Sequence, residues 1–171
     1  MKGKSVKYRV NIITLSDSGV KGLRKDTSAP ALKEMLHREE GFEVTDMLLL
    51  SDDRTELEAV LIDICDNNRA DLILTTGGTG LSPRDNTPEA TLAVIEKNVP
   101  GIAEAMRLKS LSITPRAMLS RGVSGIRKST LIINLPGSPK GSVENLEAVL
   151  PALPHALGIL TGREHECAQK K

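Results

Sequence analysis

The sequence predicts an α/β fold with three α/β/α layers, in which a mostly parallel β-sheet with a short antiparallel hairpin lies between two layers of helices. Strand-like apolar runs alternate with helical patterns along the chain, as is typical of such sheets. The run 72–75 is apolar without alternation, as expected of a strand buried on both faces. A tight turn at 127–129 separates two strand-like runs, which predicts the hairpin. We expect residues 1–171 to form a single domain, with flexible ends at about 1–6 and 163–171.

Five short segments have the composition of β-strands. They are rich in Ile, Val, Leu and Thr and are bounded by residues that favour turns. These predicted strands cover 8–15, 42–50, 72–75, 123–126 and 130–135. Since helical patterns separate the first three, we expect those strands to pair in parallel.

The helical segments carry start and stop signals. The first is expected to begin with Ser28 as its N-cap, to hold Pro30 in its first turn and to stop at Gly41. The second carries Leu57, Val60, Leu61 and Ile64 at helical spacing. Further helices are predicted near 87–89, after 99–101, and from about 142 onwards, the last with a bend at Pro151 and Pro154.

Composition excludes several function classes. The chain has 23 Lys and Arg against 22 Asp and Glu, with one Tyr, one Phe and no Trp. Nucleic-acid-binding domains usually have a basic surplus and aromatic stacking residues, so we expect no nucleic-acid partner. No apolar run approaches the ~18 residues that span a bilayer, and the first residues lack a signal-peptide pattern. We therefore expect a cytoplasmic protein without a membrane partner.

Three glycine-containing loops follow predicted strands, over 16–26, 75–87 and 136–141. In open α/β sheets, ligands bind outside the carboxyl ends of the strands, and glycine lets the backbone approach an anion closely. We therefore expect the loops to hold a phosphate-bearing small molecule. One such loop could equally serve only to turn the chain, but three at equivalent strand ends favour binding.

The loop sequences do not match two common nucleotide-binding motifs. Gly77–Gly80 lacks the G-x-G-x-x-G spacing of a dinucleotide fold. The segment 122–129 resembles a Walker A loop, but Arg127 stands where the second glycine is required, and a strand follows instead of a helix. We interpret that segment as a structural turn.

Three carboxylates fall just past strand ends or at the heads of helices: Asp17, Asp52 and Asp85. A pair of them could hold Mg²⁺ together with substrate phosphates. The alternative is that they cap helices or brace turns. Arg84 and Lys140 are candidate phosphate partners, with solvated surface charges as the alternative.

Three segments of the chain resemble motifs of the Mog-type molybdopterin adenylyltransferases of molybdenum-cofactor biosynthesis. They are Thr75–Thr91 (TTGGTGLSPRDNTPEAT), Leu119–Arg127 (LSRGVSGIR) and Ile132–Lys140 (IINLPGSPK). The first is specific for the superfamily, and the other two favour the Mog branch over the related MoaB branch. The resemblance covers about 7–162. Asn86 departs from the small aliphatic residue often found in the family.

The resemblance implies a compact α/β/α molybdopterin-binding domain, usually a homotrimer. It implies transfer of AMP from ATP to the terminal phosphate of molybdopterin, release of pyrophosphate, and hand-over of the product to a molybdenum-insertion protein. By this resemblance Asp52 and Asp85 are the catalytic residues and the Mg²⁺ ligands, and the loop after the first strand binds nucleotide. The nucleotide-binding residues are then Ser16, Asp17 and Ser18. The residues expected to bind pterin and phosphate are Thr76, Gly77, Gly78, Thr79, Gly80, Arg84, Pro136, Gly137, Ser138 and Lys140.

Two other functions stay open at this point. A non-catalytic molybdopterin-binding or carrier protein of the MoaB-like branch would keep the glycine loops without needing metal-holding carboxylates. A scaffold protein would keep the fold alone, since a fold does not fix a function.

Overall fold

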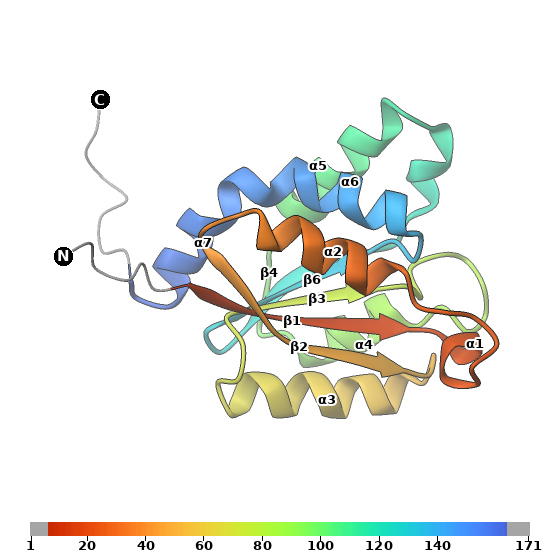
Figure 1. Cartoon of the computed structure of the whole chain (residues 1–171), viewed down its shortest axis with the longest axis horizontal. Coiled ribbons are helices and arrows are strands. Elements are labelled where there is room, and N and C mark those ends of the chain that lie inside the picture. The colour runs from red at the N-terminus through yellow and green to blue at the C-terminus, as the bar shows by residue number, and fades with distance from the viewer. Residues whose placement is uncertain (1–6, 164–171) are drawn as a thin grey trace.

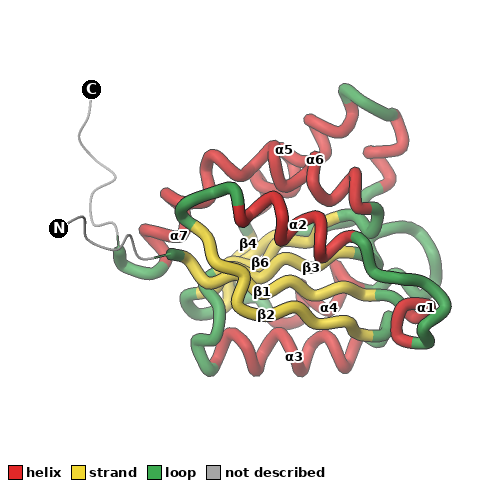
Figure 2. Tube along the Cα trace, in the orientation of Figure 1, coloured by secondary structure: helices red, strands yellow, loops and turns green. Residues whose placement is uncertain are grey.

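The computed structural model describes residues 7–163, which form a six-stranded sheet between two layers of helices (Figures 1 and 2). The strands are β1 (Tyr8–Leu15), β2 (Phe42–Leu50), β3 (Leu72–Thr76), β4 (Lys97–Asn98), β5 (Ser124–Arg127) and β6 (Thr130–Leu135). Their order in the sheet is β2-β1-β3-β6-β5-β4. The first four in that order are parallel, and β5 pairs antiparallel with both β6 and β4. The predicted α/β fold, its mostly parallel sheet and its hairpin are confirmed.

The helices pack in two sets. Four lie on one face of the sheet: α2 (Ser28–His37), α5 (Pro100–Leu111), α6 (Pro139–Val149) and α7 (Leu153–Leu160). Two lie on the other: α3 (Arg54–Asp66) and α4 (Thr87–Val94). The remaining elements are the short α1 (Asp17–Val20) and two 3₁₀ turns, Pro115–Leu119 and Leu150–Ala152. Within residues 7–163, none of the helices has the length and apolar character needed to cross a membrane.

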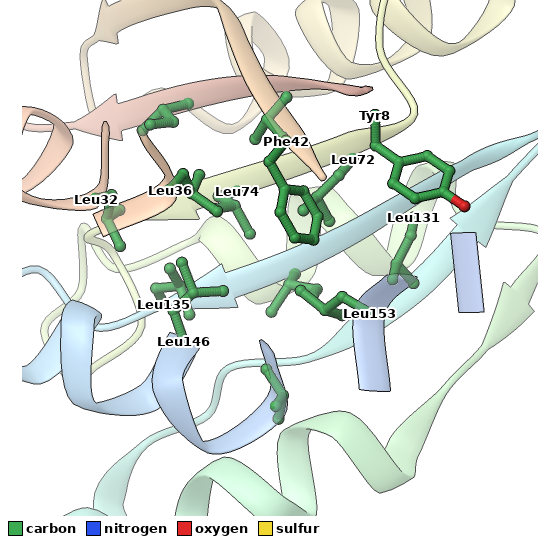
Figure 3. Close-up of a cluster of buried hydrophobic side chains, with 14 of the residues drawn as sticks. Tyr8, Leu32, Leu36, Phe42, Leu72, Leu74, Leu131, Leu135, Leu146 and Leu153 are labelled. Carbon is green, nitrogen blue, oxygen red and sulfur yellow. The ribbon is translucent and has the colours of Figure 1, made fainter. Parts of the chain in front are cut away.

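Two apolar cores lie between the sheet and the two layers of helices. The larger one joins β1, β3 and β6 to the four-helix face and contains Phe42, Leu72 and Leu146, all almost fully buried (Figure 3). The smaller one joins the opposite side of the same strands to α3 and α4 through residues such as Ile73 and Leu61. Consecutive residues of β3 therefore point into different cores. This explains why the strand is apolar along its whole length.

The order of the strands creates a crevice at their carboxyl ends. β1 connects through α2 to β2 on one side, whereas β3 lies on the other side of β1 and leads into α4 on the opposite face. The loops that leave β1 and β3 therefore separate at this point, where open α/β sheets bind their ligands.

Three details of the predicted elements are corrected. Ser28 is not the N-cap of α2, because the carboxylate of Asp26 accepts hydrogen bonds from the backbone N–H groups of Ser28 and Ala29 instead (2.9 and 3.2 Å). The last helical segment begins at Pro139, before the expected start near 142, since the Ser138 hydroxyl caps it. The strand predicted over 72–75 extends to Thr76.

The segment 122–129 holds β5 and the turn of the predicted hairpin, and β6 forms its second strand. β5 and β6 are joined through Lys128, whose φ of 53° makes the tight turn. Flexible ends were expected at 1–6 and 163–171, and these fall outside the described residues except for Arg163.

Candidate active site at the carboxyl end of the sheet

The three glycine loops meet around one cavity of about 500 Å³. It opens at the carboxyl ends of β1 and β3, between the loop that precedes α2 and the loop that precedes α6. Ten of the predicted site residues line it: Ser16, Asp17, Ser18, Asp52, Thr76, Gly77, Gly78, Asp85, Gly137 and Ser138. Residues from all three loops therefore line one cavity, and their role in binding stays a prediction.

Two of the glycines are required by close backbone contacts. Gly77 has a φ of 102°, and a Cβ atom there would lie 2.4 Å from the carbonyl oxygen of Leu15. Gly78 has a φ of 65°, and its Cβ would lie 2.2 Å from Oγ1 of Thr87. Both positions combine a left-handed backbone with contact to another loop or helix, so a side chain would push the loops apart.

The loops after β1 and β2 are joined by two aspartates. The backbone N–H of Asp17 donates to Oδ2 of Asp52 (2.8 Å), and the backbone N–H of Asp52 donates to Oδ1 of Asp17 (3.0 Å). Arg84, from the loop after β3, donates from Nε and Nη2 to the two carboxylate oxygens of Asp17, both at 2.9 Å. Residues from three loops therefore fix one another at the edge of the cavity.

The two aspartates differ in charge environment. The hydrogen bonds from the Arg84 guanidinium and from the Asp52 backbone lower the pKa of Asp17 to about 2. Burial raises the pKa of Asp52, and the negative charges of Asp17 and Asp85 add to that effect despite the hydrogen bond from the Asp17 backbone. Asp52 is therefore a half-buried carboxylate whose negative charge is poorly compensated, as is common at sites that bind cations.

Helix capping does not account for Asp52. Asp53 is the N-cap of α3, and its Oδ1 accepts a hydrogen bond from the backbone N–H of Glu56 (2.8 Å). A Cβ atom on Gly78 would lie 3.6 Å from Oδ1 of Asp52, so this carboxylate reaches toward the glycine loop across the cavity. Asp85 does brace a turn, because its Oδ2 accepts from the backbone N–H of Ser82 (2.9 Å).

The residues present fit a magnesium ion that is shared with a substrate. Within 7–163, no group of three or more His, Cys, Asp or Glu side chains is arranged to hold a metal by protein ligands alone. Asp52 and Asp85 nevertheless both line the cavity, and Mg²⁺ is usually bound by one or two carboxylates together with substrate phosphates and water.

The remaining predicted site residues lie outside this cavity. Thr79, Gly80 and Pro136 line a second cavity of about 290 Å³, which shares Ser138 with the first. Lys140 lines neither; its side chain is 80% exposed, and Nζ lies 3.8 Å from Oε1 of Glu144 on the next turn of α6.

Two cationic side chains that line the main cavity were not predicted from the sequence. Arg24 and Lys25 line it from the loop between α1 and α2, and both are exposed. No ion pair of either side chain is found within the described part of the chain. The signal that could have found them is their place in the loop 16–26, which had already been assigned to this edge of the sheet.

Known proteins match this chain over nearly its whole length. The family described as "probable molybdopterin binding domain" matches residues 11–155. A molybdopterin adenylyltransferase of Helicobacter pylori J99 is 41% identical over 94% of this chain and 92% of its own. One of Escherichia coli K12 is 43% identical over 84% and 74%, respectively. The crystal structure of the molybdopterin biosynthesis enzyme MoaB from Thermus thermophilus is 54% identical, covers 91% of this chain and 97% of its own, and superposes with a TM-score of 0.85.

Proposed function

Because the chain belongs to the molybdopterin-binding domain family, as its three motifs predicted, we propose that it is a molybdopterin adenylyltransferase. It transfers AMP from ATP to the terminal phosphate of molybdopterin and releases pyrophosphate. The observation that carries the proposal is the cavity itself, in which glycine loops, two exposed cations and the poorly compensated carboxylate of Asp52 meet at the crevice of the sheet.

The reaction requires that two anions approach each other. The terminal phosphate of molybdopterin attacks the α-phosphorus of ATP, the new P–O bond forms, and the bond to the pyrophosphate leaving group breaks. Positioning and electrostatic stabilisation supply most of the catalysis in such transfers. Gly77 and Gly78 allow the loop after β3 to pack closely against Leu15 and Thr87 beside the cavity, and Arg24 and Lys25 are placed to bind phosphate oxygens.

Asp52 and Asp85 are the residues that would hold Mg²⁺. When bound, the ion would neutralise charge on the phosphates of ATP. Asp17 has a different role in this proposal, because Arg84 already neutralises it; it orders the loop that faces the nucleotide and presents its backbone N–H to Asp52.

Several wider properties follow from the family resemblance and are part of the proposal. They are a homotrimeric assembly, hand-over of adenylylated molybdopterin to a molybdenum-insertion protein, and a cytoplasmic location. Nucleic acid and membranes are not expected as partners.

The test is an omission experiment with the purified protein. Molybdopterin, ATP and Mg²⁺ are incubated together and singly omitted, while pyrophosphate and adenylylated pterin are quantified by chromatography. Product that needs all three components supports the transferase. Pterin that binds without forming product would overturn it in favour of a carrier, and Asp85→Asn serves as the matched control for contaminating activity.

A further inference from the structure

The loop between β3 and α4 is held near its tip by the pair of Arg84 with Asp17 and at its neck by Arg121. Residues 81–84 at its tip are exposed, yet the loop carries Arg84, which pairs with Asp17, and Asp85, which lines the main cavity. An exposed loop tip is mobile unless contacts at its base restrain it. Besides the pair of Arg84 with Asp17, the position of Asp85 therefore depends on what joins the two sides of the neck, at Gly80 and at Asp85.

Arg121 joins both sides of the neck. Its Nε donates to the carbonyl oxygen of Gly80 (2.7 Å), and its Nη2 donates to the carbonyl oxygen of Asp85 (2.5 Å). Its own backbone N–H donates to the carbonyl oxygen of Thr79 (3.0 Å), and its Nη1 forms an ion pair with Glu89 in the first turn of α4. One side chain thus fixes the start of the loop, its end, and the helix that follows.

The segment that carries Arg121 is itself anchored. Arg107 of α5 donates from Nη1 to the carbonyl oxygens of Gly122 (2.8 Å) and Ser120 (3.5 Å), on either side of Arg121. The backbone of Val123 then exchanges hydrogen bonds with Asn134 of β6. The backbone around Arg121 is therefore fixed relative to the sheet and α5, and the Arg121 side chain in turn fixes the loop.

We propose that Arg121 is a positioning residue of the adenylyl transfer, which holds the loop neck so that Asp85 faces the substrate phosphates. The inference rests on the proposed function for its catalytic part. Arg121 lines neither of the two cavities, so it acts through Asp85 and Arg84 without touching substrate.

This role requires arginine specifically. A guanidinium presents its donors in a planar fork, which allows simultaneous bonds to two carbonyl oxygens and one carboxylate. Lysine keeps the charge, but its single ammonium group cannot span Gly80, Asp85 and Glu89 in the same way. Arg121→Lys consequently separates the effect of geometry from that of charge.

Arg127 provides the matched control. It also binds a carboxylate and a backbone carbonyl, donating to both oxygens of Asp66 (2.8 and 2.8 Å) and to the carbonyl of Val94 (2.9 Å). It lies in the β5–β6 hairpin and lines none of the cavities described above. Arg127→Lys therefore reports what loss of a comparable structural arginine does to the fold.

The experiment measures amide hydrogen exchange over 77–87 and steady-state kinetics in the full chain and in both lysine variants. For Arg121→Lys we expect exchange in this loop to become about tenfold faster, the effect of losing a charge-assisted hydrogen bond. We expect kcat to fall about 10²-fold, as misplaced catalytic groups do, with KM for ATP nearly unchanged. Arg127→Lys should change neither the loop exchange nor kcat.

Two outcomes would overturn the positioning role. One is loop exchange and kcat that stay at the wild-type values in Arg121→Lys. The other is exchange that accelerates throughout the chain in both variants alike, since Arg121 would then be a general contact of the fold. If the unaltered protein forms no adenylylated product while Arg121→Lys still loosens the loop alone, the proposed function fails and the positioning of the loop stands.

Discussion

The amino ends and the carboxyl ends of the parallel strands hold carboxylates in opposite charge environments: Asp71 precedes β3, and Asp52 follows β2. At the amino end, Asp71 is almost fully buried and is surrounded by cations: Arg9 binds it through its backbone N–H (2.8 Å) and its guanidinium (2.9 Å), and Arg163 approaches to 3.4 Å. Although burial alone would raise the pKa of Asp71, the hydrogen bonds from Arg9 lower it. Near the carboxyl end, burial raises the pKa of Asp52, and its carboxylate faces two further acids.

Under the proposed function, this difference separates a structural charge from a functional one. A buried carboxylate whose charge is balanced by arginines gains nothing from an additional cation. A half-buried carboxylate whose neighbours are acidic is stabilised by any cation that arrives, and this is the property of a site that binds Mg²⁺ with substrate. The sheet thus carries a structural carboxylate at the amino end of its strands and the proposed site at their carboxyl ends.

The largest effect is expected when the acids of the cavity are neutralised, because this removes the proposed difference between the two ends of the sheet. Asp85→Asn and Asp52→Asn keep the shape of the side chains but remove the charge that would hold the metal. We expect kcat to fall by about 10²–10³, the usual cost of losing one transition-state stabiliser. The measurement is the rate of adenylylated-pterin formation at saturating Mg-ATP.

Binding of molybdopterin by these variants is the control, and it should be retained. Near-normal turnover in both variants would show that the carboxyl-end acids are structural, like Asp71, and would remove the basis of the catalytic assignment.

Neutralising the amino-end acid should affect stability and leave catalysis unchanged. Asp71→Asn leaves Arg9 and Arg163 without their carboxylate. We expect a loss of about 2–3 kcal/mol in the free energy of unfolding, below the full cost of breaking a buried pair, because both arginine side chains remain 33% exposed. Chemical denaturation measures this loss, and a change in kcat of the folded variant would contradict the separation of roles.

The cations of the cavity should act mainly on substrate binding. Arg24→Ala combined with Lys25→Ala removes two exposed charges that line the cavity. We expect KM for ATP to rise about tenfold, since one charge-assisted hydrogen bond has roughly that effect, while kcat changes less. Steady-state kinetics at two salt concentrations checks this, because salt should weaken ATP binding in the unaltered protein more than in the double variant.

The smallest expected effect is on the pKa of Asp17. Arg84→Gln removes the hydrogen bonds that hold this pKa at about 2, so it should rise toward the value of an ordinary aspartate. The pKa of Asp52, which the Arg84 charge lowers, should rise further. Carboxyl NMR titration measures both. An acid limb of kcat/KM that moves to higher pH in the variant would identify Asp52 as the group that must be ionised.

Much of the fold could be predicted because its signals are local. Apolar runs give the strands of a parallel sheet, and the positive φ angles of Gly77 and Gly78 are a local property of the backbone that glycine favours, whereas their close contacts with Leu15 and Thr87 come from the tertiary fold. Ser28 was misassigned as a cap because the helix starts earlier than its sequence pattern suggests. Asp26 accepts from the backbone N–H groups of Ser28 and Ala29, and the Ser28 hydroxyl donates to the distant carbonyl of Gly137.

The site was harder to predict where long side chains are involved. Lys140 lies in the first turn of α6, where its ammonium group is near Glu144 and outside the cavity, whereas Arg24 and Lys25 reach the cavity from a loop without any motif. The side-chain contacts of Arg121 join segments that lie 32 to 41 residues apart in the chain. Such directions depend on tertiary packing, which residue spacing does not encode.

The most direct test of the proposed adenylyl transfer uses ATP labelled at its α-phosphate. The labelled nucleotide is incubated with molybdopterin, Mg²⁺ and either the unaltered protein, Asp85→Asn or Asp71→Asn. If the chain transfers AMP with the help of Asp85, we expect label in the pterin product with the unaltered protein and with Asp71→Asn, and about 10²-fold slower labelling with Asp85→Asn. Label that stays in ATP with the unaltered protein, or that transfers equally well with Asp85→Asn, would contradict it.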